Sequence, residues 1–405
     1  MDTVEHVFRK LPAECLEQLK SRLIHHLILK KVFHPFRAFG QYHQVAFDAT
    51  EVHSYKKEHD GTYKTSNKGY FCITSETLEI LTKKGMSSSL LVALEELEGR
   101  KWKGKEKFFQ EVSPLFSEEE WRIWSEPLRK YSGNTTWHLY VLEAKLVTKN
   151  GFAVSIATEW IENGEEYEKQ DCESKAFLRI SQKIKSEFPR LPILVLADGL
   201  YPNDTVLTQC RKLEWAFLLV LKDGNLKSLW EEINALSQLE PEKKLQKTSK
   251  KQIQHYRWFC DLEYQNHKIS YGECVEIILK ENFDTEKKVK FAYVSNIPVT
   301  KDNIETFIEV GRQRHKIENQ GFKTQKVNGF HLEHKISRNE LAFKNWYQCL
   351  QIAHLLYQLL SLSKHFREWK GELTLLFLWK YLFAALLLEE IEFSNENKKR
   401  QFRYQ

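Results

Sequence analysis

The spacing of apolar residues predicts helices at the start of the chain and a strand after them. Residues 1–40 carry leucines at helical spacing, which predicts a short helical N-terminal region. The apolar run Val45–Phe47 ends on Asp48, the pattern of a short buried strand. Ser54–Asn67 is polar and predicts a loop. Residues 66–133 are expected to form a helical insertion, with helical patterns over 77–82, 89–97 and 118–124.

From residue 134 the pattern changes to that of an α/β protein. Two runs rich in β-forming residues flank the Asn-Gly pair of Lys149–Gly151, which predicts a β-hairpin. Helices and apolar strands then alternate. The expected elements are a helix over 173–187, a strand over 192–197, a helix over 205–213 and a strand over 216–221. Because such strands lack polar alternation, they are expected to be buried on both faces. Residues 41–65 and 134–224 together therefore predict one mixed α/β core.

The segment 225–300 is a second expected insertion, rich in strand-like runs. It begins with a helix near 226–236 and a polar, Lys-rich linker over 239–252, and its strands are expected to form a small separate sheet. Asp302 is then expected to cap a long helix that reaches Gln320, within a helical segment 301–330. Residues 331–405 predict a helical C-terminal region, in which the apolar stretch Leu373–Leu388 is expected to be a buried helix.

Composition narrows the class of protein only slightly. With 42% hydrophobic and 13% aromatic residues over 405 positions, the chain can fill a sizeable core. The net charge of +6 fits a polyanionic partner but is weak evidence alone. The seven cysteines form no CxxC pair, which argues against a structural zinc site and favours reduced thiols. No secretory signal or membrane span is expected, so the predicted location is cytoplasmic.

Two aspartates follow predicted buried strands. Asp48 comes after Val45–Phe47 and Asp198 after the strand ending at Ala197, and ligand sites collect at this edge of open α/β sheets. The alternative is that each acid forms a turn or caps a helix. Small residues follow both aspartates, and Gly199 keeps the backbone close and leaves the carboxylate uncrowded. Hard cations such as Mg²⁺ prefer such oxygen ligands, and two ions about 4 Å apart can activate a hydroxyl for attack on a phosphodiester.

A third acid, Glu318, lies in a basic segment. Arg314 is four residues earlier, on the same helical face, and Lys323 and Lys326 follow. Basic residues beside a metal-binding acid make sense if the substrate is a phosphate backbone; the alternative is a surface salt bridge. Trp258 is a candidate for stacking on an unpaired base, with a core tryptophan in a strand as the alternative.

Taken in order, Asp48 with its strand, Leu196–Gly199 and Arg314–Asn319 resemble the DDE transposases of bacterial insertion sequences. The likeness covers about residues 40–65 and 135–355 and is to the group with a β-rich insertion and a Tyr-Arg-Glu-Lys signature. The resemblance implies a ribonuclease H-like core, two Mg²⁺ ions with Mn²⁺ as a substitute, and a homodimer on terminal inverted repeats. It assigns Asp48, Asp198 and Glu318 to the catalytic, metal-binding triad.

The signature itself is incomplete. Arg314 matches its arginine, whereas the tyrosine position is Gly311 and the lysine position is Gln325, next to Lys326 and near Lys323. The resemblance implies DNA contacts for Arg314, for these lysines and for Trp258. Only 47 residues precede Asp48, which is short for an N-terminal DNA-recognition domain, so a shortened or degenerate copy is one possibility.

The hypothesis is a nucleoid-associated DNA transposase that cleaves double-stranded DNA at element ends and joins the 3′-hydroxyl to target DNA. The rivals are a ribonuclease H-like nuclease that joins nothing and a degenerate remnant that only binds DNA. The same metal chemistry serves cleavage and joining, so the residues do not decide between the transposase and the nuclease.

Overall fold

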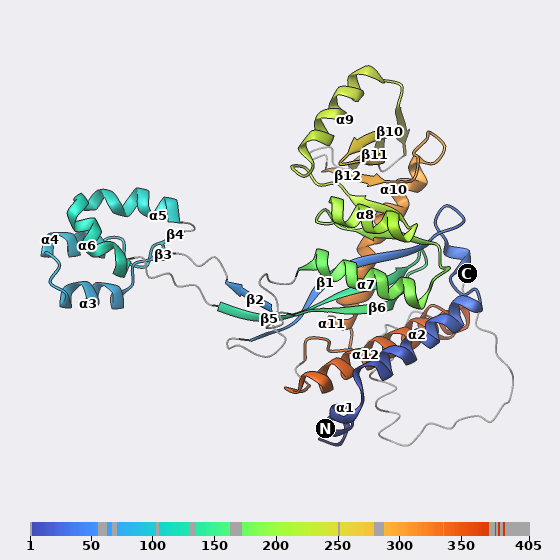
Figure 1. Cartoon of the computed structure of the whole chain (residues 1–405), viewed down its shortest axis with the longest axis horizontal. Helices are drawn as coiled ribbons and strands as arrows, with labels where there is room; N and C mark the ends of the chain where they lie inside the picture. The colour runs from blue at the N-terminus through green and yellow to red at the C-terminus, as the bar shows by residue number, and fades with distance from the viewer. Residues whose placement is uncertain are drawn as a thin grey trace. The chain divides into compact units, whose positions relative to one another are not determined.

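The computed structural model describes residues 2–55, 63–66, 71–102, 105–128, 135–162, 172–249, 252–278, 287–334 and 336–371, with 377, 380 and 384. The strands are β1 His43–Tyr55, β2 Tyr63–Ser66, β3 Phe71–Cys72, β4 Lys101–Trp102, β5 Thr135–Val147, β6 Ala153–Ile161, β7 Ile193–Ala197, β8 Ala216–Val220, β9 Lys244–Thr248, β10 Gln252–Tyr264, β11 His267–Ile278 and β12 Lys287–Ser295. Across the described residues, ten of them form one mixed sheet (Figure 1). Its order is β2-β5-β1-β7-β8-β12-β11-β10-β9, and β6 pairs with β5.

The centre of this sheet is parallel. β7 pairs with β1 on one side and with β8 on the other, and all five residues of β7 are buried. This burial on both faces is what the uninterrupted apolar run predicts. The predicted hairpin is also confirmed, because β5 and β6 pair from Val147↔Ala153 outward across a turn at Gly151, whose φ is +110°. The chain is therefore a mixed α/β protein with a large mixed sheet.

The strands of segment 225–300 do not form a separate sheet, and that prediction is wrong. β12 pairs with β8, for example at Ser295↔Leu218, so the antiparallel meander β9–β12 continues the main sheet. The reason is that β8 has a backbone edge free beyond β7, and β12 satisfies its hydrogen bonds. The polar run expected to be a linker likewise contains a strand, β9, whose Leu245 lies opposite Tyr256 of β10.

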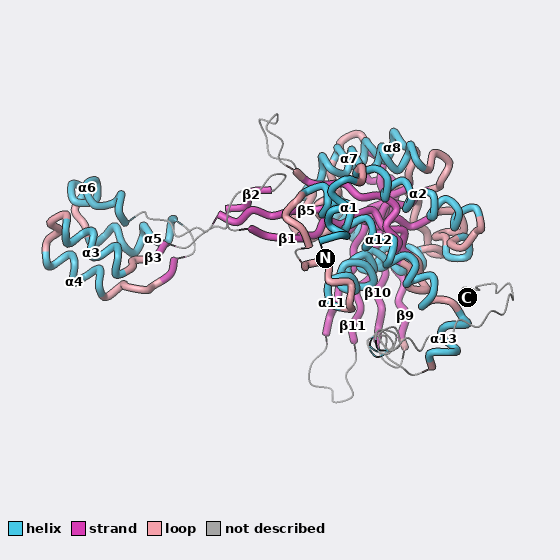
Figure 2. The backbone as a smooth tube through the Cα atoms, turned by 90° about the horizontal axis from the view of Figure 1, so that it is seen from below, coloured by secondary structure: helices cyan, strands magenta, loops and turns pink. Residues whose placement is uncertain are grey.

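Helices cover both faces of the sheet. The described α-helices of the larger unit are α1 Asp2–Lys10, α2 Ala13–Leu29, α7 Glu173–Glu187, α8 Asp204–Leu213, α9 Lys227–Leu239, α10 Ile304–Arg312, α11 Lys323–Val327, α12 Glu340–Ser361 and α13 Lys364–Lys370. Successive residues of a strand point to opposite faces. Phe47 of β1 contacts Phe177 of α7, whereas its neighbour Ala46 packs in a cluster with Ile317 and Phe322. Ile317 and Phe322 therefore lie on the face opposite α7, and Figure 2 shows α7 at the top of the view with α11 and α12 below it.

The predicted long helix after residue 301 is interrupted. Asn303, not Asp302, occupies the N-cap of α10. After Arg312 the chain forms a 3-10 turn over Gln313–His315 and a π-helix over Ile317–Phe322 before α11 begins. The predicted C-terminal helical region contains α12 and α13, whereas Leu373–Leu388 lies almost entirely outside the described residues. Among the helices described, none is long and apolar enough to cross a membrane.

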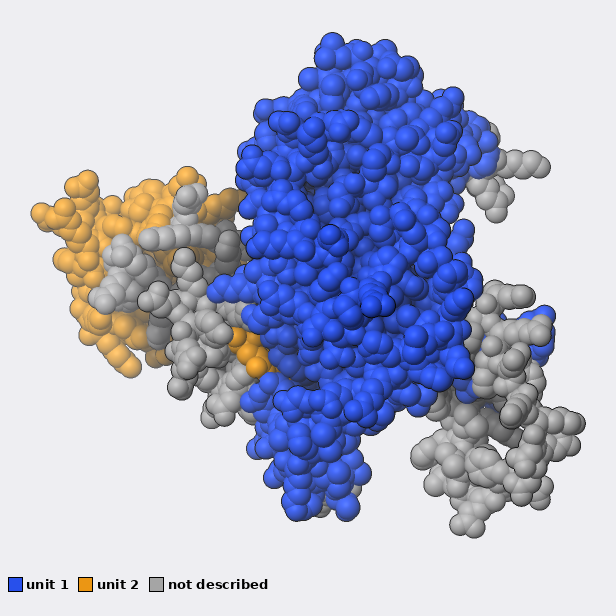
Figure 3. Space-filling view, turned by 45° about the vertical axis from the view of Figure 1, so that its right-hand side comes forward, with its two compact units in different colours: residues 1–52, 140–161, 165–405 blue, residues 53–139, 162–164 orange. Residues whose placement is uncertain are grey.

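The chain separates into two compact units (Figure 3). The smaller unit comprises residues 53–139 and 162–164, and the segment expected as a helical insertion lies within it. Its helices are α3 Ser75–Lys83, α4 Ser88–Glu95, α5 Lys105–Val112 and α6 Glu118–Leu128. They enclose a core of their own, in which Phe108 stacks on Phe71 and meets Trp102 edge-on. The larger unit comprises residues 1–52, 140–161 and 165–405 and contains every candidate site residue named above.

Candidate active site at the carboxyl edge of the parallel strands

Asp48 and Asp198 share one position in the sheet register. β1 pairs with β7 from His43↔Ile193 to Ala46↔Leu196, and each aspartate lies two residues beyond the last of these pairs. The two strands are parallel, so both carboxylates leave the sheet at the same edge. One detail of the prediction is wrong: β1 continues to Tyr55, so Asp48 lies within a strand. The pairing of β1 with β7, however, ends near Asp48, at Ala46↔Leu196.

Arg314 connects Asp48 to Glu318. One guanidinium nitrogen of Arg314 lies 3.7 Å from Oδ2 of Asp48, and the other donates to Oε1 of Glu318 at 2.5 Å. Arg314 is 19% exposed and Glu318 50% exposed, so the pair lies at the border between core and solvent. The predicted same-face pair of Arg314 and Glu318 is therefore present, and it lies beside Asp48 instead of on a distant surface.

Glu318 is the second residue of the π-helix Ile317–Phe322. In a π-helix the hydrogen bonds span one more residue than in an α-helix, and such turns are frequent at functional sites. The buried side chain of Lys145 lies under this turn. A Cβ at Gly321 would lie 3.1 Å from its Cδ, and its ammonium lies 5.5 Å from the centre of the Phe322 ring.

Lys222 is a site residue that the sequence analysis missed. Its Nζ donates to Oδ2 of Asp198 at 2.8 Å, while the backbone N–H of Leu200 donates to Oδ1, also at 2.8 Å. Lys222 follows β8, whose Leu219 pairs with Ala197 of β7. The rule that placed Asp48 and Asp198 at one sheet edge would have placed Lys222 there as well, because a buried parallel strand precedes it too.

Glu173 and Tyr201 complete the acidic surroundings. Glu173 is the first residue of α7, and the hydroxyl of buried Tyr201 donates to its Oε2 at 3.3 Å. Burial raises the pKa of Glu173, and the charge of Asp198 raises it further. Nothing local in the sequence marks Glu173, because an acid in the first turn of a helix usually stabilises only that helix.

The pKa of Asp48 is raised by its burial and by the neighbouring acids. Burial raises it most, Arg314 opposes the rise, and the negative charges of Glu318, Glu173 and Asp198 add to it, for a value of about 7. Acids from α7, the π-helix and the end of β7 thus act on the one carboxyl group of Asp48 in β1. A site of this kind favours the arrival of positive charge, since a cation relieves both the desolvation and the repulsion.

In the described part of the chain, no three His, Cys, Asp or Glu side chains converge as a metal-binding group. The charges near Asp48 and Asp198 are instead balanced by side chains. Arg314 lies between Asp48 and Glu318, and Lys222 holds Asp198. The acids are therefore grouped by strand register and electrostatics, with protein cations between them.

A basic cavity adjoins these acids. It has a volume of about 490 Å³, and the cations along its wall are Lys222, Lys290, Arg312 and Arg314, with His315 beside them. Lys290 contacts Asp223 at 3.2 Å and Arg312 contacts Glu276 at 2.7 Å. The cavity thus begins at the two cations that hold Asp48 and Asp198 and continues along β12.

The other candidate DNA contacts lie elsewhere. Lys323 is exposed, while Lys326 donates to the carbonyl of Glu51 at 3.2 Å and pairs with Glu333 at 3.1 Å. Gln325, at the place of the signature lysine, is fully buried. Gly311, at the place of the signature tyrosine, lies against the ring of Tyr293, which a Cβ would approach to 2.6 Å.

Trp258 does not present a ring face to a base in this structure. It is only 7% exposed and belongs to the apolar cluster that α10 supplies with Ile304 and Phe307. The base-stacking prediction is therefore not supported, and the alternative of a core tryptophan in a strand describes Trp258. The reason is that α10 covers this face of β10.

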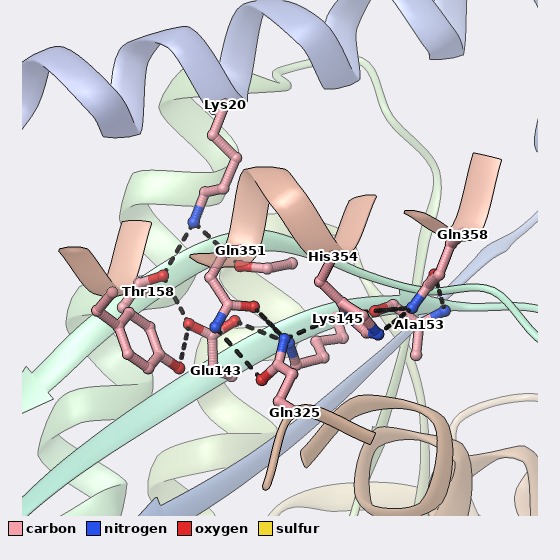
Figure 4. A network of polar contacts seen from close by, with 11 residues as sticks. Lys20, Glu143, Lys145, Ala153, Thr158, Gln325, Gln351, His354 and Gln358 are labelled. Atoms are coloured by element: carbon pink, nitrogen blue, oxygen red, sulfur yellow. Dashed lines mark hydrogen bonds and ion pairs between the residues drawn. The ribbon is translucent and has the colours of Figure 1, made fainter. Parts of the chain in front are cut away.

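A buried polar network supports the segment that carries Glu318 (Figure 4). Lys145 donates to Gln351 at 2.7 Å, and Gln325 donates to the same oxygen at 2.8 Å. On the other side of the network, Glu143 accepts from Thr158 and Tyr347 and lies 3.6 Å from Lys145. Lys20 of α2 donates to Ser155 and Thr158. The network ties β5, β6, α2, α11 and α12 together directly beneath the π-helix.

Comparison with known families identifies the family of the chain. The family model described as "Transposase DDE domain" matches residues 101–356, and no curated protein matches the chain. The matched range contains Asp198, Glu318, Arg314 and Lys222, while Asp48 lies before it. The match extends over more than half of the chain. The chain therefore belongs to the family of transposases with a DDE domain.

Proposed function

We propose that this transposase cleaves phosphodiester bonds at the ends of an insertion sequence and joins the resulting 3′-hydroxyl to target DNA, using Asp48, Asp198 and Glu318. One observation carries the proposal: strand register brings Asp48 and Asp198 to one edge, where Arg314 links Asp48 to Glu318. The large mixed sheet and the family membership support a ribonuclease H-like core, with 66–133 and 225–300 as its insertions.

The three acids fit a hard divalent cation by donor type. They offer only carboxylate oxygens, the ligands that Mg²⁺ prefers, and burial raises the pKa of Asp48, to which the charges of Glu318 and Asp198 add. We assign two Mg²⁺ ions to Asp48, Asp198 and Glu318, with Mn²⁺ as a substitute. When bound, such ions lower the pKa of the attacking hydroxyl and stabilise the leaving oxygen.

The chain's own cations then orient the DNA. Arg314 and Lys222 lie beside the acids and line the basic cavity, where their charges would meet phosphate oxygens. Exposed Lys323 extends this charge beyond the π-helix. Phosphate contacts release counterions, so the affinity for double-stranded DNA, both inverted repeats and target, should fall steeply with salt. In the DNA complex we assign a homodimer, with one protomer for each element end.

The test is a strand-cleavage assay with Asp48→Ala on a labelled duplex that carries the element's ends. Cleavage should disappear while DNA affinity changes little, because Asp48 is only 21% exposed and its negative charge offers a phosphate no favourable contact. Asp223→Ala, which removes an 83% exposed acid next to Lys222, is the matched control and should cleave normally. Undiminished nicking by Asp48→Ala would falsify the proposal.

The second candidate function is a nuclease that cleaves DNA with the same acids but joins no strands. The observation that favours it is Gln325, which is buried at the position of the signature lysine. A strand-transfer assay with pre-cleaved ends separates the two activities. Products of joining support transposition, whereas hydrolysis without joining supports the nuclease. Duplex binding with neither activity would indicate a degenerate remnant.

A further inference from the structure

We propose that Lys222 is an exchangeable counter-ion: it holds Asp198 in the DNA-free protein and transfers to a phosphodiester oxygen when a divalent cation and a DNA strand enter. This inference rests on the proposed function and adds a coupling residue to it. Through Lys222, the divalent cation and the DNA strand would each strengthen the binding of the other.

The position of Lys222 allows its head to move while its stem stays in place. Cγ, Cδ and Cε of Lys222 pass over Gly199 so closely that a Cβ there would lie 2.5, 2.6 and 3.0 Å from them. Asn225 donates to the carbonyl of Gly199, which joins the loop after β8 to the loop after β7. The Lys222 side chain is nevertheless 54% exposed. Its ammonium can therefore leave Asp198 by rotation of its terminal bonds without repacking the core.

The cations of the cavity divide into two kinds. Lys290 and Arg312 pair with Asp223, Glu273 and Glu276, which lie outside the proposed triad. Lys222 and Arg314 pair with the triad itself. A divalent cation on those carboxylates would repel the ammonium of Lys222 and take over its role as counter-ion. The released ammonium lines the cavity in which a phosphate would lie.

This exchange has a thermodynamic signature. If the cation frees Lys222 for phosphate, the cation must raise DNA affinity by the factor by which DNA raises cation affinity. Removing Lys222 removes a competitor from Asp198, so the cation should bind more tightly in the absence of DNA. Removing Lys222 should also reduce towards one the factor by which the cation and DNA raise each other's affinity. A purely structural lysine predicts the opposite first result, because loosening the loops after β7 and β8 would weaken cation binding.

The experiment measures Mn²⁺ binding to the full chain by electron paramagnetic resonance, with and without a random-sequence 30-bp duplex. In Lys222→Gln we expect DNA-free Mn²⁺ affinity to rise by roughly two- to fivefold, the range expected for loss of one exposed ion pair. The duplex should raise Mn²⁺ affinity in the wild type and much less in Lys222→Gln. Lys222→Arg, which keeps the charge, should retain the coupling. Lys247→Gln breaks another exposed ion pair, with Glu305 at 2.6 Å, and should behave like the wild type.

The outcomes separate this inference from the proposed function. Unchanged or weaker Mn²⁺ affinity in a folded Lys222→Gln variant, or coupling equal to that of the wild type, overturns the exchange and leaves the metal-dependent function standing. Absence of Mn²⁺ binding in the wild type, or full binding in Asp198→Asn, overturns both. Tighter DNA-free binding together with lost coupling supports the exchange.

Discussion

A methyl group at Gly199 would lie 2.5 Å from Cγ of Lys222. The glycine after Asp198 is therefore required by the close approach of a side chain from the neighbouring strand end. It does not serve a left-handed backbone conformation, since its φ lies outside that region. Gly199 and Lys222 together set where the ammonium meets Asp198.

The first prediction concerns Gly199→Ala. The new methyl group should displace the Lys222 stem, which is free to move into solvent, so the free energy of unfolding should change by no more than about 1 kcal/mol. The ammonium should lose its contact with Asp198. DNA-free Mn²⁺ affinity should therefore rise as in Lys222→Gln, and thermal melting should stay close to that of the wild type. Wild-type affinity in this variant would show that the Lys222 stem does not depend on Gly199.

The second prediction concerns pH and Asp48→Asn. The pKa of Asp48 in the folded protein is about 7, above the ordinary aspartate value of 3.8, so ionisation of Asp48 opposes folding. Below 3.8 the group is protonated in both states and has no effect. As pH rises from about 4 through 7, the wild type should lose stability, by an upper bound on the order of 4 kcal/mol. Asp48→Asn should not lose this stability.

Thermal melts of both proteins between pH 4 and pH 8 measure this difference. The melting temperature of Asp48→Asn relative to the wild type should increase across the range. Asp223→Asn, which changes an exposed acid of the same neighbourhood, should follow the wild type at every pH. Parallel curves for Asp48→Asn and the wild type would contradict the raised pKa.

The third prediction concerns the buried network. Lys145 and Glu143 are fully buried, and burial lowers the pKa of Lys145 to about 8. Lys145→Met would remove the closer of the two buried cations that act on Glu143 and leave only Lys20, with a loss of up to about 3 kcal/mol of stability in denaturant unfolding. The double variant Glu143→Gln/Lys145→Met should recover part of it. Equal stability of the single variant and the wild type would contradict a stabilising contribution of Lys145 to this network.

The fourth prediction concerns Gly311→Ala. Its methyl group would meet the ring of Tyr293 at 2.6 Å, and Tyr293 is a buried residue of β12 that cannot move into solvent. Overpacking of this kind costs about 1–3 kcal/mol and would shift the helix that leads to Arg314. Tyr293→Leu in the same chain should relieve the overlap, so the two changes should be non-additive in a double-mutant cycle. Additive losses would indicate that Gly311 and Tyr293 are not coupled.

The sequence allowed most of the central sheet to be predicted, because β7, β8 and the Val45–Phe47 part of β1 are short apolar runs typical of strands buried on both faces. The edge that gathers Asp48 and Asp198 follows from the same reasoning. The merger of β12 with β8 could not be predicted, since pairing between residues such as Ser295 and Leu218 leaves no local signal.

The π-helix around Glu318 could not be predicted from the sequence either, because over a few residues its apolar spacing does not differ from that of an α-helix. The burial of Trp258 could not be predicted either, because it results from tertiary packing of α10 against β10. Glu173 could not be recognised for the same reason: its charge matters only because folding brings it near Asp48 and Asp198.

The continuation of the main sheet through β9–β12 has a consequence for self-association. Among the described strands, β9 ends the sheet, and it presents Lys244 and Lys247 to solvent along its short length. Charged, brief edge strands resist the addition of a strand from another molecule, because pairing would bring like charges together and bury them. Aggregation of protomers through this edge of the sheet is thus disfavoured.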